Sequence, residues 1–277
     1  MAARQKKVST PTGKSVFSTK GKVVCIFGES PLVEEYAARC LSKGFQVHVR
    51  LNGSSQRRKR SRGNTTHLPT GAKLVTKASA ETYCALELTN TSVEAKKKNL
   101  LDFEKTLRPS TIIITSSTTI TVTEQCTWVS APGRLIGLGA LPSLLQGSLL
   151  EFAPSPMSDE STITAAKEFA GALDKEPAIV QDSVGLVLPR IICMLANEAC
   201  FAMMEGVAQG TDIDTAMKLG TNYPYGPLEW AERIGLRQVH AVITSLHRSY
   251  GEERYRVAPL LARAALSTHS QVDSVLR

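Results

Sequence analysis

The chain has 277 residues, enough for two domains, and its 42% hydrophobic and 21% charged residues are typical of globular proteins. No apolar run is long enough for a membrane span, and six scattered cysteines predict neither a metal site nor disulfides, so we expect reduced cysteines in a cytoplasmic protein. Of the 33 basic residues, eleven lie in residues 1–28 and 57–62, and the other 22 are matched by 25 acidic ones, which argues against a nucleic-acid-binding body.

The N-terminal third of the chain begins with a basic stretch and continues as a βαβ unit. Residues 1–21 are basic, rich in serine and threonine and free of acids, which favours a flexible tail or, alternatively, an organelle transit peptide. Residues 22–28 are a continuous apolar run typical of a buried parallel strand. Residues 30–44 have helix signals, with Pro31 in the first turn, and residues 45–51 form the next strand. This order predicts a doubly wound sheet.

The next 130 or so residues alternate between expected strands and expected helices. Residues 52–72 are polar and basic and predict an exposed loop. Expected strands are residues 72–77, 82–88, 110–117, 133–141, 148–154 and 177–182, and expected helices are residues 92–107 and 159–175. From Gly185 onward every patterned segment is helical. We therefore predict an α/β domain over residues 22–182 and an all-α domain over residues 183–277.

The helical part contains several motifs that resemble one enzyme family. They are "NEA", "EGVA", "DIDTAMKLG", "YPYGPLEW" and "ERYRVAPLL", all within residues 197–261. Together with the upstream residues 158–183, they are similar to the 3-hydroxyacyl-CoA dehydrogenases, and the resemblance extends over residues 22–263. It implies a Rossmann-like NAD domain, a helical domain that forms a homodimer, and hydride transfer between NAD and the 3-carbon of a 3-hydroxyacyl-CoA.

The resemblance also implies where a catalytic pair should lie. In the family a histidine abstracts a proton and a glutamate twelve residues later orients it. Glu151 falls on the glutamate, but Gly139 falls on the histidine, and Pro142 and Pro189 fall on two asparagines. Two interpretations of Glu151 stay open: a strand-end carboxylate without chemistry, or a direct general base whose pKa is raised by burial.

A substrate-binding serine of the family falls on Thr118 or Thr119, so a hydroxyl donor is retained there. Glu87 and Lys96 fall on a strand-end glutamate and a helix lysine that lie near the nicotinamide in the family.

The turn after the first strand departs from the GxGxxG pattern that holds a dinucleotide. Gly28 retains the first glycine, whereas Ser30 and Val33 replace the second and third, and Glu29 adds negative charge beside the expected pyrophosphate.

The ribose-binding acid is also missing, because Asn52 lies near its place. Arg57 and Arg58, in the loop "RRKRSR", are suited to a 2′-phosphate, which favours NADP over NAD; a solvated basic loop is the alternative.

Two functions follow from these observations. One is an NAD(P)-dependent 3-hydroxyacyl-CoA dehydrogenase of fatty-acid metabolism with a degenerate site. The other is a catalytically inactive paralogue that retains the fold and the dimer and binds a nucleotide, an acyl-CoA or a partner protein. Met194, Cys200, Met203 and Met204 are candidates either for the dimer surface or for the domain core.

Overall fold

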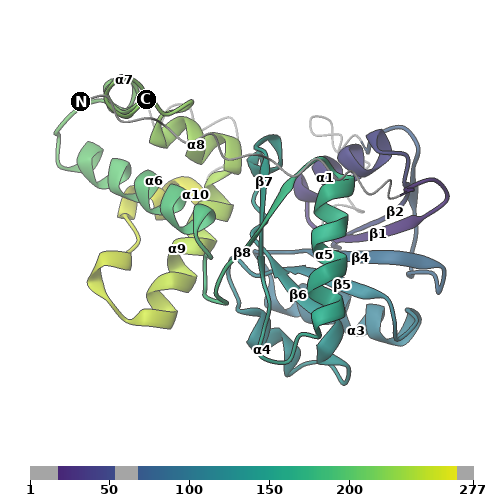
Figure 1. Ribbon diagram of the computed structural model, residues 1–277. Coiled ribbons are helices and arrows are strands. Elements are labelled where there is room, and N and C mark those ends of the chain that lie inside the picture. Colours follow the sequence, from purple (N-terminus) through teal and green to yellow (C-terminus); the bar gives the residue numbers. More distant parts are fainter. Residues whose placement is uncertain (1–17, 54–67, 267–277) are drawn as a thin grey trace, which may run out of the picture.

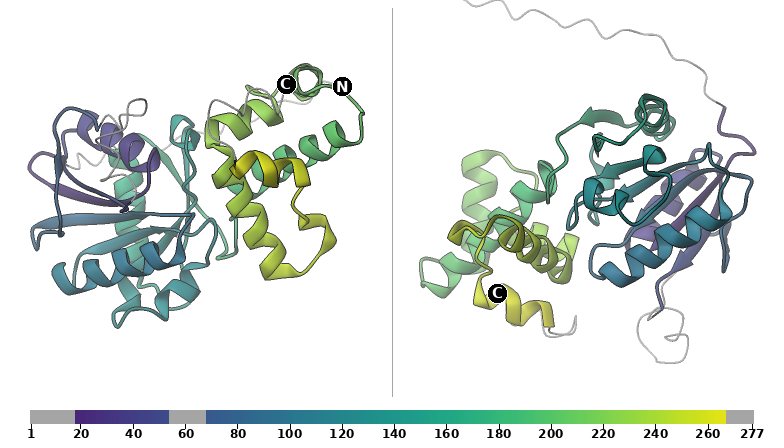
Figure 2. Two further views of the ribbon diagram at one scale, coloured as in Figure 1. Left: turned by 180° about the vertical axis from the view of Figure 1, so that it is seen from behind. Right: turned by 90° about the horizontal axis from the view of Figure 1, so that it is seen from below.

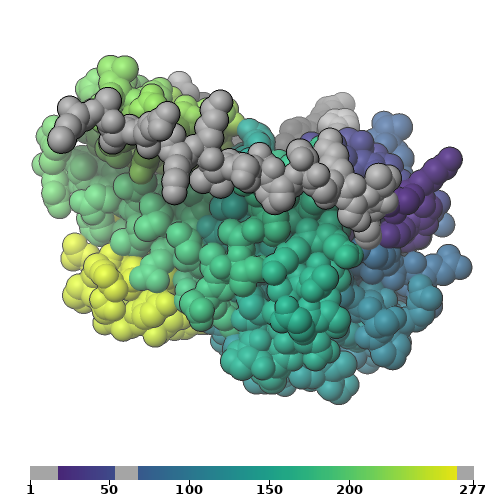
Figure 3. All heavy atoms as spheres, in the orientation of Figure 1, coloured from purple at the N-terminus to yellow at the C-terminus, as the bar shows by residue number. Residues whose placement is uncertain are grey.

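The computed structural model describes residues 18–53 and 68–266, which form an α/β part and a helical part lying side by side (Figure 1). Most of the predicted tail, together with Arg57 and Arg58, lies outside the described residues. In the space-filling view the helical part, green to yellow, lies against one side of the purple-to-teal α/β part (Figure 3).

The α/β part is built on one eight-stranded sheet. Its strands are β1 (Val23–Gly28), β2 (Gln46–Leu51), β3 (Ala72–Leu74), β4 (Thr82–Leu88), β5 (Ile112–Ser116), β6 (Leu135–Leu138), β7 (Leu149–Ala153) and β8 (Glu176–Ile179). The order across the sheet is β3-β2-β1-β4-β5-β6-β7-β8, and β6–β7 is the one antiparallel pair in it. The chain therefore builds outward from β1 in one direction and then from β4 in the other.

Helices cover both faces of this sheet, as the two further views show (Figure 2). The helices α1 (Leu32–Ser42) and α5 (Glu160–Ala172) pack on one face, where Tyr36 and Phe169 join the largest apolar core. On the opposite face lie α3 (Val93–Thr106) and the short α4 (Val122–Cys126), with Phe103 stacked on Phe27 of β1. Burial on both faces explains why the central strands are continuous apolar runs.

The helical part has its own apolar core. Its helices are α6 (Leu188–Met204), α7 (Gly210–Thr221), α8 (Pro227–Ile234), α9 (Leu236–Tyr250) and α10 (Pro259–Leu266). The helical stretch of residues 226–251 is divided at Gly235, whose φ of 91° is easily adopted only by glycine. Cys200 is buried in this core and Met194 and Met203 pack against it, so of the four candidate dimer residues only Met204 is largely exposed.

The predicted fold class, an α/β Rossmann-like domain followed by an all-α domain, is confirmed. The last strand ends at Ile179 and the first helix of the helical part begins at Leu188, on either side of Ser183. All six cysteines are buried and free, and burial raises the pKa of Cys25 and of Cys40 to about 12. Among the described residues, no helix combines the length and the apolar character that crossing a bilayer requires.

Candidate functional site

The candidate site begins at the carboxyl ends of β1 and β4, where the strand order reverses. Ligands of doubly wound sheets bind in the crevice outside such a switch point. Gly28 ends β1 so close to β4 that a Cβ on it would collide with the Leu88 carbonyl. This glycine is therefore required by the approach of the chain's own backbone, whether or not a ligand binds.

A buried ion pair lies beneath this edge. Lys96 of α3 and Glu87 of β4 are essentially inaccessible to solvent, and the Lys96 ammonium donates to the Glu87 carboxylate. Lys96 Nζ also donates to the Ser116 carbonyl at 2.8 Å. The two residues that the resemblance implied for the nicotinamide side are thus in contact, and each also has further hydrogen-bond partners inside the protein.

Asn52, the residue near the place of the missing ribose-binding acid, points toward β4. Its Nδ2 donates to Thr89 Oγ1 at 2.9 Å, and its Oδ1 accepts from Asn99 Nδ2 at 3.1 Å. Asn99 in turn donates to Glu87 Oε1 at 3.0 Å. Asn52 therefore extends the network of the buried ion pair to the end of β2.

Asn90, two residues past β4, is the centre of a second network, and sequence reasoning missed it. Its Oδ1 accepts from Ser116 Oγ at 2.5 Å and from Thr118 Oγ1 at 2.7 Å. Thr119 Oγ1 donates to the Asn90 carbonyl at 3.0 Å. The hydroxyl protons of Thr118 and Thr119 are therefore engaged inside the protein. The available signal was a polar residue directly after a buried strand at the carboxyl edge of the sheet.

The Gly139–Glu151 pair lies on the other side of the site, with Gly139 directly after β6 and Glu151 on β7. The backbone places the two residues opposite each other, with Gly139 N donating to the Glu151 carbonyl at 2.9 Å. A Cβ on Gly139 would lie 3.3 Å from Glu151 Oε2 and 3.5 Å from Pro189 Cγ. A side chain at position 139 would therefore contact this carboxylate, as the implied alignment requires, but the glycine supplies no acid or base.

The Glu151 carboxylate binds the start of α6 instead. Its two oxygens accept from Val187 N at 3.1 Å and from Leu188 N at 2.8 Å, groups that have no acceptor within the helix. The negative charge also lies at the positive end of the helix dipole. Glu151 thus works as a helix cap that links the two parts of the molecule.

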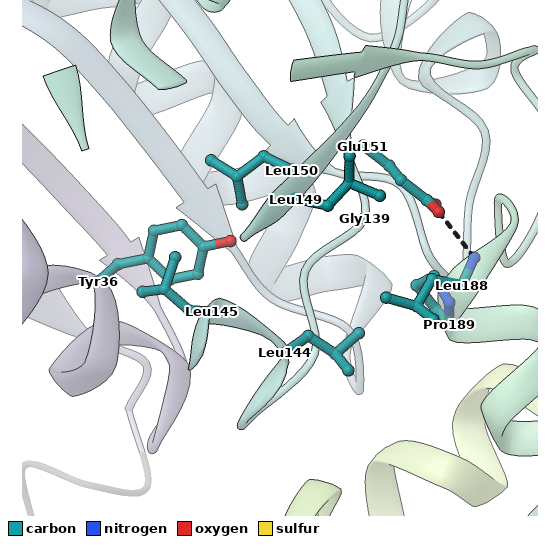
Figure 4. Close-up of a pocket in the computed structure, with 9 residues that line it drawn as sticks. All are labelled: Tyr36, Gly139, Leu144, Leu145, Leu149, Leu150, Glu151, Leu188 and Pro189. Atoms are coloured by element: carbon teal, nitrogen blue, oxygen red, sulfur yellow. Dashed lines mark hydrogen bonds between the residues drawn. The ribbon is translucent and has the colours of Figure 1, made fainter. Parts of the chain in front are cut away.

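A small cavity separates Tyr36 of α1 from this cap (Figure 4). Its nine lining residues are Tyr36, Gly139, Leu144, Leu145, Leu149, Leu150, Glu151, Leu188 and Pro189. Its volume of about 10 Å³ is room for about one water molecule. This cavity is therefore too small to hold an acyl chain.

The turn after β1 is packed without the second and third glycines of the dinucleotide fingerprint. Val33, at the third glycine position, is completely buried among the side chains between α1 and the sheet, and Ser30 is half-buried ahead of the helix. The Glu29 carboxylate extends across the switch point and accepts from Asn90 N and from Gln238 Nε2 of α9. A carboxylate held by hydrogen bonds from both domains therefore lies at the switch point.

Sequence reasoning also missed a chain of contacts that connects α1 to α8 of the helical part through Ser143. Glu35 of α1 accepts from Ser143 N at 3.0 Å, and Ser143 Oγ donates to the Arg233 carbonyl of α8 at 3.2 Å. Burial raises the pKa of Glu35, and the Ser143 N–H opposes that rise. Sequence reasoning placed Glu35 only within the expected helix of residues 30–44.

A doubly wound sheet with a crevice at its switch point, followed by a helical domain, defines a two-domain α/β protein of the nucleotide-binding class. Residues 15–183 match the description "3-hydroxyacyl-CoA dehydrogenase, NAD binding domain", and residues 185–274 match the C-terminal domain of the same family. The chain belongs to the 3-hydroxyacyl-CoA dehydrogenase family. A domain of this description implies an NAD(P) cofactor.

Curated relatives are similar over part of their length. The chain is 32% identical over 170 residues to a 3-hydroxybutyryl-CoA dehydrogenase of Bradyrhizobium diazoefficiens, covering 61% of this chain and 58% of that one. It is 30% identical over 178 residues to the enzyme of that name from Clostridioides difficile, covering 64% and 63%. The chain thus spans about three fifths of these relatives.

Among solved structures, the (S)-3-hydroxybutyryl-CoA dehydrogenase of Ralstonia eutropha superimposes with a TM-score of 0.71 at 25% identity, covering 88% of this chain and 93% of that one.

Proposed function

We propose that this chain is a diverged family member that does not carry out hydride transfer by the family's histidine–glutamate route. One observation carries the proposal: position 139 is glycine, and both oxygens of Glu151 accept from the first amides of α6. Oxidation of a hydroxyl group needs a base within hydrogen-bond reach of the proton it removes. Gly139 has no such group, and the sequence has no histidine between His67 and His240.

The role that fits better is that of a non-catalytic paralogue that binds a nucleotide or an acyl-CoA, or serves as a partner subunit. Two further replacements support this role. Pro142 and Pro189 lie where the resemblance implies asparagines, and neither can donate a hydrogen bond from its side chain. Thr118 and Thr119 already donate to Asn90.

An active dehydrogenase is the second candidate, and the Glu87–Lys96 pair favours it. Both residues match the implied positions and are in contact. In this candidate Glu151 acts directly as the general base, which requires it to release the α6 amides.

Reduction of acetoacetyl-CoA with NADH and with NADPH separates the two candidates. We expect no measurable turnover with either cofactor, whereas a rate of about ten per second or more with either one contradicts the proposal. Calorimetric titration with NAD, NADP and acetyl-CoA, in parallel, measures binding without chemistry. Binding of any of these without turnover supports the non-catalytic role.

For the cofactor we propose NADP in preference to NAD, on the sequence of the basic loop alone. Arg57 and Arg58 have the charge that a 2′-phosphate requires. The double substitution of both arginines by alanine should weaken binding of NADP far more than binding of NAD. An equal effect on the two dinucleotides would favour the alternative interpretation, in which this loop is a solvated basic segment.

For assembly we propose a homodimer formed through the helical domain. Val187, directly before α6, and Ile191 of α6 are exposed, and Leu219 of α7 is 82% exposed. Exposed apolar side chains on neighbouring helices are typical of interaction sites. Light scattering on the wild type should give twice the monomer mass, and Leu219→Asp should lower it. Leu74→Asp, on the edge strand β3, is the matched control and should leave the mass unchanged.

A further inference from the structure

Glu29 is the residue that follows β1, and its carboxylate is held by three donors. Oε1 accepts from Asn90 N at 2.9 Å and from Gln238 Nε2 at 2.6 Å, and Oε2 accepts from Thr91 Oγ1 at 2.5 Å. Asn90 and Thr91 follow β4, whereas Gln238 belongs to α9 of the helical domain. One side chain thus joins both strands of the switch point to the second domain.

The contacts close into a ring. Asn90 Nδ2 donates to Gln238 Oε1 at 3.0 Å, while Asn90 N and Gln238 Nε2 both donate to Glu29. Asn90 and Gln238 are each only 6% exposed. Breaking the ring leaves the buried Gln238 amide without these partners, while Asn90 Nδ2 keeps its bond to the Ala140 carbonyl at 2.9 Å. Hydrogen bonds to an ionised acceptor are also stronger than neutral ones.

The position of the ring gives it a consequence for ligands. The crevice between the carboxyl ends of β1 and β4 is where a doubly wound sheet binds a dinucleotide. The three donors to Glu29 are uncharged, so the negative charge of the carboxylate is not neutralised by them. A pyrophosphate approaching this point meets a hydrogen-bonded side chain of like charge.

We propose that the Glu29–Asn90–Gln238 ring is a latch that holds the two domains closed over the crevice in place of a ligand, and that it must open before a dinucleotide can enter. The latch goes beyond the proposed function. It concerns the contact between the two domains and the access of a dinucleotide to the crevice, not hydride transfer.

Hydrogen–deuterium exchange tests the closure. Glu29→Ala and Gln238→Leu should each speed exchange of the Asn90 amide and of the first turns of α9 about tenfold. The double variant should exchange no faster than the singles, because both break one ring. Glu94→Gln, which removes an exposed carboxylate of α3 that contacts Ser92, is the matched control and should leave exchange unchanged. Unchanged exchange in both single variants, or additive effects in the double variant, overturns the latch.

NADH fluorescence titration tests the gate. Glu29→Ala removes both the ring and the charge, so it should bind NADH at least tenfold more tightly than the wild type. Gln238→Leu retains the charge and should gain less. Equal affinity of wild type and Glu29→Ala, or no binding to either, overturns the gating role. The acetoacetyl-CoA assay is independent of both measurements, so failure of the latch and failure of the proposed function are distinguishable.

Discussion

Two regions of the site have a carboxylate at a position that the family resemblance implies, and the two carboxylates have different partners. Glu87 has kept its partner, because Lys96 lies against it and both are buried. Glu151 faces a glycine, and the first amides of α6 bind its two oxygens. The difference teaches that a retained acidic residue is no proof of retained chemistry, since a buried carboxylate persists wherever donors satisfy it.

The largest effect should come from breaking the retained pair. Lys96→Met leaves the Glu87 carboxylate buried without its cation, and we expect the free energy of unfolding to fall by about 3–5 kcal/mol. Urea denaturation followed by circular dichroism measures it. The double variant Glu87→Gln with Lys96→Met should recover most of the loss, because it leaves no buried charge. If the free energy of unfolding of the single variant fell by less than about 1 kcal/mol, the ion pair would be dispensable for stability. The contrast between Glu87 and Glu151 would then be lost.

The helix cap gives the next largest effect. Glu151→Ala removes the acceptor of two α6 amides and a charge at the helix N-terminus, and we expect a loss of about 1–2 kcal/mol. Hydrogen exchange should localise the loosening to the first turn of α6. Asp182→Ala is the matched control, because Asp182 accepts from Val122 N and Thr123 N of α4 within the α/β domain. Similar loosening of α6 in both variants would contradict a local cap.

Placing a histidine at position 139 should change stability less and activity not at all. A side chain at position 139 meets Glu151 and Pro189 at 3.3 Å and 3.5 Å, so we expect Gly139→His to cost about 1 kcal/mol through tight packing. Acetoacetyl-CoA reduction should stay undetectable, because Glu151 remains bound to α6. Gly147→His, on the loop between β6 and β7, is the control for a histidine added nearby. Turnover restored by Gly139→His alone would mean that the histidine was the only catalytic loss.

The fold was predictable from sequence and much of the site was not, for one physical reason. Continuous apolar runs such as residues 22–28 and 110–117 report burial directly, so strands β1 and β5 were predicted within two residues at each end. The short α4 was missed, because five residues hold little periodicity.

Hydrogen-bond partners depend instead on which segments meet in space. Asn90 and Gln238 are 148 residues apart, and no pattern in either segment indicates the other. A pairing of Glu87 with Lys96 could be expected only because the resemblance to the family implied that both residues lie near one ligand.

Glu35 gives the smallest effect and tests whether a carboxylate in a structural role still carries a cost of ionisation. Burial raises its folded pKa, the Ser143 N–H opposes the rise, and the charge of Glu34 adds to it. A raised folded pKa means that the stabilising contribution of this group is complete below the pKa of an unfolded glutamate, about 4.3, and is lost as the pH rises through the folded value.

Glu35→Gln retains an acceptor for Ser143 N without the charge. We therefore expect the variant to be more stable than the wild type at pH 7, by no more than about 1 kcal/mol, and the difference to vanish below about pH 4. Thermal unfolding across this pH range measures it, and a wild type that is more stable at pH 7 would show that the Ser143 contact outweighs burial.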